Sequence, residues 1–164
     1  MTLLRFLAIV GLGLWIGGLV ALGAIGAPTL FSVLESTQGA AGRELAGAAF
    51  GAIFQRFQYI SIGLGALVGV SLGFRAAIGP RPTHFKLRLW AVIGLLVIAG
   101  TTAFVLAPRI DAIRRSVPVS IASLPTDDAR RATFGRLHGL ANALMLVTVV
   151  VGLGLCWAEA TDRQ

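Results

Sequence analysis

The sequence predicts an all-α, polytopic membrane protein: a four-transmembrane-helix bundle with an extended second helix and an amphipathic lead-in. Two observations support this fold class. Hydrophobic residues make up 56% of the 164 residues and charged residues only 13%, about half of what a soluble domain carries. The apolar residues also form four runs, each near the roughly 20 residues that a helix needs to cross a membrane. We expect one domain with spans at residues 6–30, 45–78, 87–108 and 130–158.

The first span follows Arg5 and is far longer than the apolar core of a signal peptide, so we expect a retained helix rather than a cleaved leader. Pro28 lacks a backbone N–H and is expected to bend or end this helix. Trp15 lies deep in the span, where it can anchor at the membrane surface or pack inside the protein. The polar stretch that carries Glu35 is expected to be a loop.

The second span is bracketed by Arg56 and Arg75, and helical signals precede it from Ala41 onward. In the register that we favour, residues 41–55 form an amphipathic helix at the membrane surface. In the alternative register, Arg56 and its polar neighbours lie inside the membrane, where an arginine costs about 2.5–3.5 kcal/mol at the centre.

The third and fourth spans are set off by different connections. The sequence Gly79-Pro80-Arg81-Pro82 breaks the helix sharply before the third span. A longer polar stretch follows that span, and within it Thr126 precedes two aspartates, which predicts a helix N-cap at Thr126. Trp90 and Trp157 are expected to anchor the helix ends at the membrane surface.

Glycine is abundant, and small residues recur every fourth position along several helices. Such ladders let helices approach closely in a membrane, so we expect them to pack the bundle. A ladder that faces outward would instead favour a homo-oligomer. The ladders are Gly13-Gly17-Ala21, Gly47-Gly51, Gly65-Gly69-Gly73 and Gly135-Gly139-Ala143.

The formal net charge is +7, and the basic residues stand between the apolar runs. We therefore expect anionic lipid headgroups, and not nucleic acid, as their partners. Four spans place both termini on one side of the membrane. The dense positive charge of the short loop between Arg75 and Arg88 favours a cytoplasmic location for both termini, in a bacterial inner membrane.

The sequence contains no convincing catalytic or cofactor-binding motif. The stretch GLGLWIGG at Gly11 lies inside an apolar run with no preceding strand, so it is not a dinucleotide fingerprint. The four spans contain no carboxylate, which argues against a proton-driven carrier. His84 and His138 lie on opposite membrane faces, too far apart to hold one haem between them. We expect a protein that is not an enzyme and needs no cofactor.

Polar residues gather where helix ends meet on one side of the membrane, and this bundle mouth is the candidate site. His138 and Asn142 are four residues apart and share a helix face. Two interpretations stay open: hydrogen bonds that only fix the fold, or a site that binds or passes a small solute or ion. The candidate residues are Gln55, Arg56, Arg109, His138 and Asn142, with Gln58, Tyr59 and Arg136 nearby.

Several short motifs occur in a recognisable order. Trp15, Gly18, Pro28 and Phe31 form a W-x-x-G…P-x-x-F pattern, the third span ends in L-x-P-R, and residues 134–140 read F-x-x-x-H-G-L. With Ile53-Phe54 and Ile60-Ser61, this set resembles the four-span membrane family of domain of unknown function 4149, which includes the transmembrane protein 205-like proteins. The resemblance implies a membrane location and fold, but no reaction.

The chain departs from the family pattern at three positions. The resemblance implies Pro at Gln55, Ser at Ala141 and Asn at Met145. Our leading functional hypothesis is a membrane protein that binds or passes a small solute or ion at the polar mouth. The alternatives are a redox protein with one haem held by His138, and a structural or accessory subunit that packs on a larger complex through its glycine faces.

Overall fold

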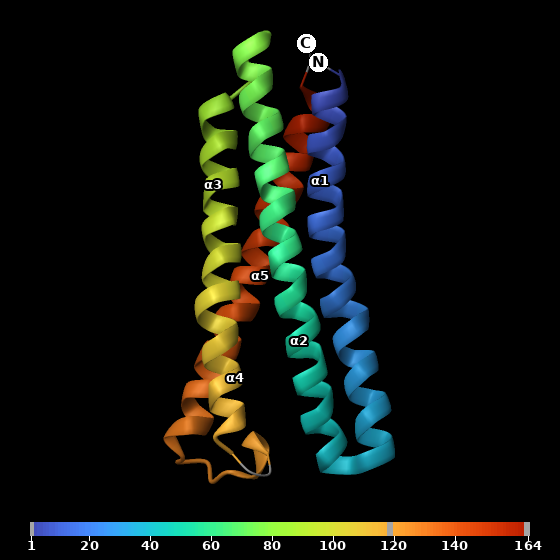
Figure 1. The fold of residues 1–164 in the computed structure, drawn as a ribbon, viewed down its shortest axis with the longest axis vertical. Helices are drawn as coiled ribbons and strands as arrows, with labels where there is room; N and C mark the ends of the chain where they lie inside the picture. Colours follow the sequence, from blue (N-terminus) through green and yellow to red (C-terminus); the bar gives the residue numbers. More distant parts are fainter. Residues whose placement is uncertain (1, 118–119, 163–164) are drawn as a thin grey trace.

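The computed structural model describes residues 2–117 and 120–162, and all regular elements within them are helices. The long helices run side by side, and α1 begins at the same end of the molecule at which α5 finishes (Figure 1). We call this end the terminal end and the opposite one the hairpin end. The elements are α1 (Thr2–Ala21), η1 (Leu22–Gly26), α2 (Ala27–Ile78), α3 (Phe85–Thr101), η2 (Thr102–Leu106), α4 (Ala107–Arg115), η3 (Ile121–Ser123) and α5 (Ala129–Thr161).

Within the described residues, three continuous helical runs are long and apolar enough to cross a membrane: Thr2–Ile78, Phe85–Arg115 and Ala129–Thr161. The first of them folds back on itself at Gly39, whose φ of 58° and ψ of −134° are readily adopted only by glycine. The chain therefore forms two antiparallel arms that meet at the hairpin end (Figure 1).

The prediction of a loop around Glu35 is wrong, because Glu35 lies in a helix. No glycine or proline stands between Pro28 and Gly39, so nothing stops the helix before that turn. The expected lead-in, residues 41–55, is helical and continuous with the residues of the second span.

Two π-helical segments, η1 and η2, each stand directly before an Ala-Pro pair. In both, the backbone N–H of the alanine bonds to the carbonyl five residues earlier. A proline cannot donate to the preceding turn and its ring crowds a carbonyl there, and the wider π turn relieves that clash. The helix thus continues through Pro28 and Pro108 with a change of direction, and Pro28 does not end it.

The apolar core lies between the π segments and the terminal end. Trp15 is only 1% exposed, so it packs inside the bundle rather than anchoring at the surface. Trp90 and Trp157 are instead 69% and 73% exposed, on an exterior that is itself largely apolar. Such an exterior suits contact with lipid. The core residues are Leu12, Trp15, Ile16, Leu19, Val68, Val92, Leu95, Ala99 and Leu155.

The glycine ladders divide into packed and outward-facing ones. A Cβ added at Gly65 would lie 2.6 Å from Leu96 Cδ2 and 2.8 Å from Trp15 Cζ3, so this glycine does allow a close approach. The ladders that begin at Gly13 and Gly135 face outward, since no described atom lies within 4 Å of a Cβ added at their glycines. A homo-oligomer formed through these outward ladders stays a prediction.

The helices of the last two runs extend beyond the expected spans. The third run continues past residue 108 as α4, and α5 ends at Thr161 rather than at 158. The N-cap expected at Thr126 is wrong. Asp128 caps α5, because its carboxylate accepts a hydrogen bond of 2.8 Å from the backbone N–H of Arg130.

Candidate functional site

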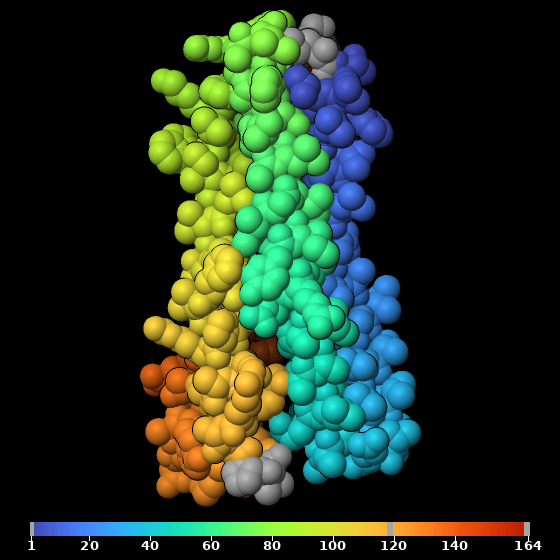
Figure 2. Space-filling model, viewed as in Figure 1, coloured from blue at the N-terminus to red at the C-terminus, as the bar shows by residue number. Residues whose placement is uncertain are grey.

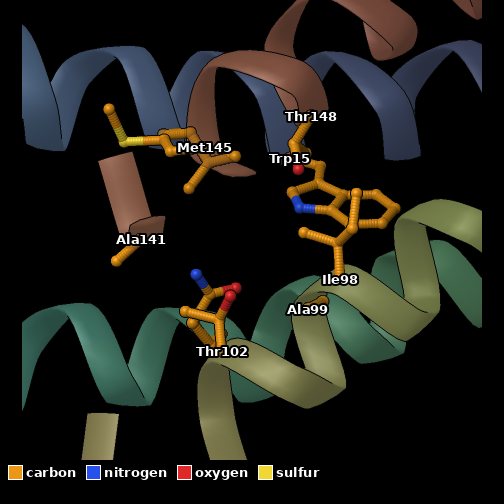
Figure 3. Close-up of a pocket in the computed structure, with 9 residues that line it drawn as sticks. Trp15, Ile98, Ala99, Thr102, Ala141, Met145 and Thr148 are labelled. Atoms are coloured by element: carbon orange, nitrogen blue, oxygen red, sulfur yellow. The ribbon is translucent and has the colours of Figure 1, made fainter. Parts of the chain in front are cut away.

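A small cavity lies inside the bundle beside η2, where α1, α2, α3 and α5 come together (Figure 3). It has about 10 Å³ of room for the centre of a water molecule, which is close to the least that one bound water needs. The residues that line the cavity are Trp15, Leu19, Gln58, Ile98, Ala99, Thr102, Ala141, Met145 and Thr148.

The indole of Trp15 presents an unused hydrogen-bond donor to this cavity. Its Nε1–H has no partner within the described residues, although it is buried. Figure 3 shows the ring between Thr148 and Ile98, with the nitrogen turned toward the open space. A buried donor without a partner costs about 1–3 kcal/mol, and natural proteins rarely leave one unsatisfied. A water molecule or a ligand atom in the cavity would satisfy it.

Three further polar side chains surround the same space: Gln58, Thr102 and Thr148 are all at most 5% exposed. The amide of Gln58 offers both donors and an acceptor. The hydroxyl of Thr148 donates to the carbonyl of Leu144 at 2.9 Å, which leaves its oxygen free to accept. None of the described residues that line the cavity is ionisable, so its chemistry suits a neutral polar group.

A second polar cluster closes the terminal end of the bundle, and its charges are all paired. Arg75 forms ion pairs with both Glu159 and Asp162, and Arg88 pairs with the same two carboxylates at 3.1 Å. All four residues are at most 5% exposed. Removing one member of such a buried set leaves an uncompensated charge, which is strongly destabilising. We call these four residues the ion cluster.

The ion cluster also ties in α1 and the loop before α3. The hydroxyl and the backbone N–H of Thr83 donate to Asp162 at 2.7 and 3.2 Å. Burial raises the pKa of Asp162, but the hydrogen bonds from Thr83 and the charge of Arg88 outweigh it and hold that pKa below its usual value. Arg5 on α1 donates to two carbonyls in the last turn of α5. These contacts therefore hold the helix ends together at the terminal end.

The sequence was compared with the models of known protein families, and one family matches. The model of the family described as domain of unknown function (DUF4149) matches residues 10–117, well over half of the sequence. The chain belongs to the DUF4149 family. Neither a curated protein nor a solved structure matches it. Family membership and the apolar helical runs identify a membrane protein of uncharacterised role.

The DUF4149 match covers the parts of α1, α2 and η2 that supply Trp15, Gln58 and Thr102, whereas α5 lies beyond it. The F-x-x-x-H-G-L motif at residues 134–140 is therefore outside the matched part, and the likeness to transmembrane protein 205 stays a prediction. Two positions at which this chain departs from the expected pattern, Ala141 and Met145, line the cavity. The α5 side of the cavity is thus more apolar in this DUF4149 chain than the resemblance implies.

The five residues predicted as the polar site share no hydrogen bond with one another in the described part of the chain. Gln55 is half-buried and donates to the hydroxyl of Tyr59 at 3.5 Å. The ring of His138 stacks on Phe134, with 5.9 Å between centroids. A ligand role for these residues stays a prediction. Four of them are exposed: Arg56, Arg109, His138 and Asn142.

The sequence analysis did not predict several residues of the cavity and the ion cluster, because few polar residues stand near them in the sequence. Trp15 and Thr102 stand in apolar runs, and only the fold shows that they meet Gln58 across a cavity. Glu159 was overlooked because it follows the expected end of the fourth span. The signal for it was topological, since Arg75 and Glu159 end the second and fourth apolar runs on the same side of the predicted bundle.

Proposed function

We propose that this DUF4149 protein is a four-span integral membrane protein that binds a small neutral polar solute, without catalysing a reaction. The arms on either side of Gly39, together with the runs Phe85–Arg115 and Ala129–Thr161, are each longer than the roughly 20 residues that span a membrane. That α1 begins where α5 ends supports an even number of crossings (Figure 1).

The observation that carries the solute proposal is the unpartnered N–H of Trp15 beside a cavity. With Gln58 and Thr102 it forms a set of donors and acceptors suited to an amide, a hydroxyl or a water molecule. An ion would enter the membrane interior without a counter-charge from the lining residues, which is unfavourable. We propose that one water fills the cavity at rest and that a polar group of the solute replaces it.

The predicted mouth residues fit this proposal as an entrance. Figure 2 shows the surface hollowed between α2 and α4, with atoms of α5 visible at the bottom of the hollow. We propose that the solute enters through this hollow, past the exposed side chains of Arg56, Arg109 and His138. The proposed location is a bacterial inner membrane, with both termini in the cytoplasm.

The experiment uses Trp15 as its own reporter. Replacing Trp90 and Trp157 by Phe removes the other two of the three tryptophans. We expect formamide, a small neutral amide, to change the emission of Trp15 in a saturable manner in purified protein in lipid nanodiscs. Ammonium and formate, charged ions of similar size, should give no saturable change. Thr102→Val in this background should weaken the apparent affinity about three- to tenfold, the usual effect of one lost hydrogen bond.

The matched control is Thr101→Val, which changes the neighbouring residue that does not line the cavity. It should leave the apparent affinity for formamide unchanged. A response to formamide that rises linearly without saturation, or one that both valine variants weaken equally, would refute solute binding at this cavity.

A further inference from the structure

Both π segments lie at the depth of the cavity. Thr102, the first residue of η2, lines it, and so does Met145 of α5. Met145 in turn packs against η1, because a Cβ added at Gly23 would lie 3.3 Å from Met145 Cε. Insertions of a π turn interrupt the regular hydrogen bonding of a helix and recur at functional sites. The two segments with irregular helical hydrogen bonding therefore lie next to the cavity.

On either side of the π segments the bundle is held together differently. Toward the terminal end lie the apolar core and the ion cluster. Toward the hairpin end α2 and α4 diverge, and the hollow opens between them (Figures 1 and 2). We call residues 27–55 the hairpin. Within the described residues, a single side-chain hydrogen bond joins the hairpin to α4: Arg114 Nη2 donates to the carbonyl of Gly47 at 2.8 Å.

Two glycines of α2, Gly47 and Gly51, leave room for the guanidinium group of Arg114. A Cβ added at Gly51 would lie 3.2 Å from Arg114 Nη2, and one at Gly47 would lie 3.9 Å from its Cζ. The guanidinium group therefore rests on bare helix backbone. Among the described residues Arg114 has no carboxylate partner, so breaking this one hydrogen bond releases the contact without stranding a second charge.

We propose that the hollow between α2 and α4 leads to a gate: the helices swing at η1 and η2, and Arg114, by holding Gly47, acts as a latch that keeps the hollow from widening as far as the cavity. The latch controls entry to the cavity, so its physiological meaning rests on the proposed solute binding. Its mechanics do not depend on any solute, because opening exposes the cavity lining to whatever reagent is present.

The experiment measures access to the cavity directly. In a Cys156→Ser background, which removes the single native cysteine, Met145→Cys places a thiol in the cavity lining. The rate of labelling by N-ethylmaleimide is measured on the full chain in lipid nanodiscs. Arg114→Ala should raise that rate about tenfold or more, since a hydrogen bond from a charged donor contributes at least such a factor to a conformational equilibrium. Arg115→Ala is the matched control and should leave the rate unchanged, because in the described part of the chain Arg115 pairs only with Asp111 on its own helix.

A second variant guards against a misfolded Arg114→Ala protein. Gly51→Ala keeps the arginine but crowds its Nη2, which must shift by a few tenths of an ångström. It should also speed labelling, by less than Arg114→Ala does, in protein that elutes as a single folded species. Unchanged labelling in both variants would overturn the latch. Faster labelling with no saturable formamide response of Trp15 would keep the gate and refute the solute. A saturable formamide response with unchanged labelling would refute the gate and keep the solute.

Discussion

The indole of Trp15 both packs in the core and presents a hydrogen-bond donor. Its six-membered ring packs against Gly65, where a Cβ would come within 2.8 Å, while its N–H faces the cavity. A phenylalanine would preserve much of the packing and lose the donor. The same separation of roles recurs in Thr148, whose hydroxyl hydrogen is used by its own helix and whose oxygen remains free to accept. Polar function is thus carried here by residues that also fill the core.

Asp162 should make stability depend on acid. Its folded pKa lies below its usual value, so its interactions with Thr83 and Arg88 contribute fully above about pH 4, the unfolded pKa. The contribution is lost as the pH falls through the lower, folded pKa. Denaturant titrations of the detergent-solubilised protein, repeated between pH 6 and acid, should show stability falling below about pH 4.

Asp162→Asn is the control for this pH dependence. The variant should be less stable at neutral pH, because both arginines of the ion cluster lose a charged partner. It should also lose less stability than the wild type on acidification. Asp128, whose pKa is also lowered by hydrogen bonds from Arg130, titrates in both proteins and cancels in the comparison. Parallel pH profiles would contradict the role given to Asp162.

At the scale of the helices, composition was enough to locate the apolar runs but not their ends. Apolar residues must be covered by lipid or by other helices wherever they occur, so the runs were predictable. The ends were set by local backbone chemistry. Pro28 was accommodated by a π turn, and Gly39 supplied the turn that a loop was expected to make. The cavity could not be predicted, because it arises only when α1, α2 and η2 bring Trp15, Gln58 and Thr102 together.

Gly65 should be the least replaceable glycine of α2 in its ladder. Gly65→Ala forces a methyl group against Leu96 and Trp15, and overpacking of this kind costs about 1–3 kcal/mol of unfolding free energy. Gly73→Ala is the matched control, since no described atom lies within 4 Å of a Cβ added there. Unfolding of both variants in mixed micelles, followed by circular dichroism, measures the difference. Equal stabilities would show that Gly65 does not mark a close helix contact.

The molecule as a whole is built asymmetrically along its long axis. Its terminal end is braced by four paired charges and a continuous core, whereas its hairpin end opens around a hollow (Figure 2). Four of the five side chains expected at the polar mouth are exposed, and their role as a site stays a prediction. The proposed gate thus lies at one end of the molecule, and the paired charges lie at the other.

The proposed topology predicts which exposed residues face which side of the membrane. In a Cys156→Ser background, Gln38→Cys at the hairpin end should react with a membrane-impermeant maleimide in intact bacterial cells. Arg81→Cys, in the loop at the terminal end, should react only after the membrane is permeabilised. Labelling of both from the same side would refute four spans, and the reversed pattern would refute only the orientation.

The ion cluster also has a consequence for the order in which the chain is assembled. Arg88 and Glu159 are 71 residues apart in sequence, and Arg75 and Asp162 are 87 apart. Both arginines are therefore synthesised long before either carboxylate. Because two unpaired guanidinium groups are costly to bury, they must remain hydrated at the membrane surface until α5 arrives. The terminal end can therefore close only after α5 has been synthesised, when both strands of the hairpin already exist.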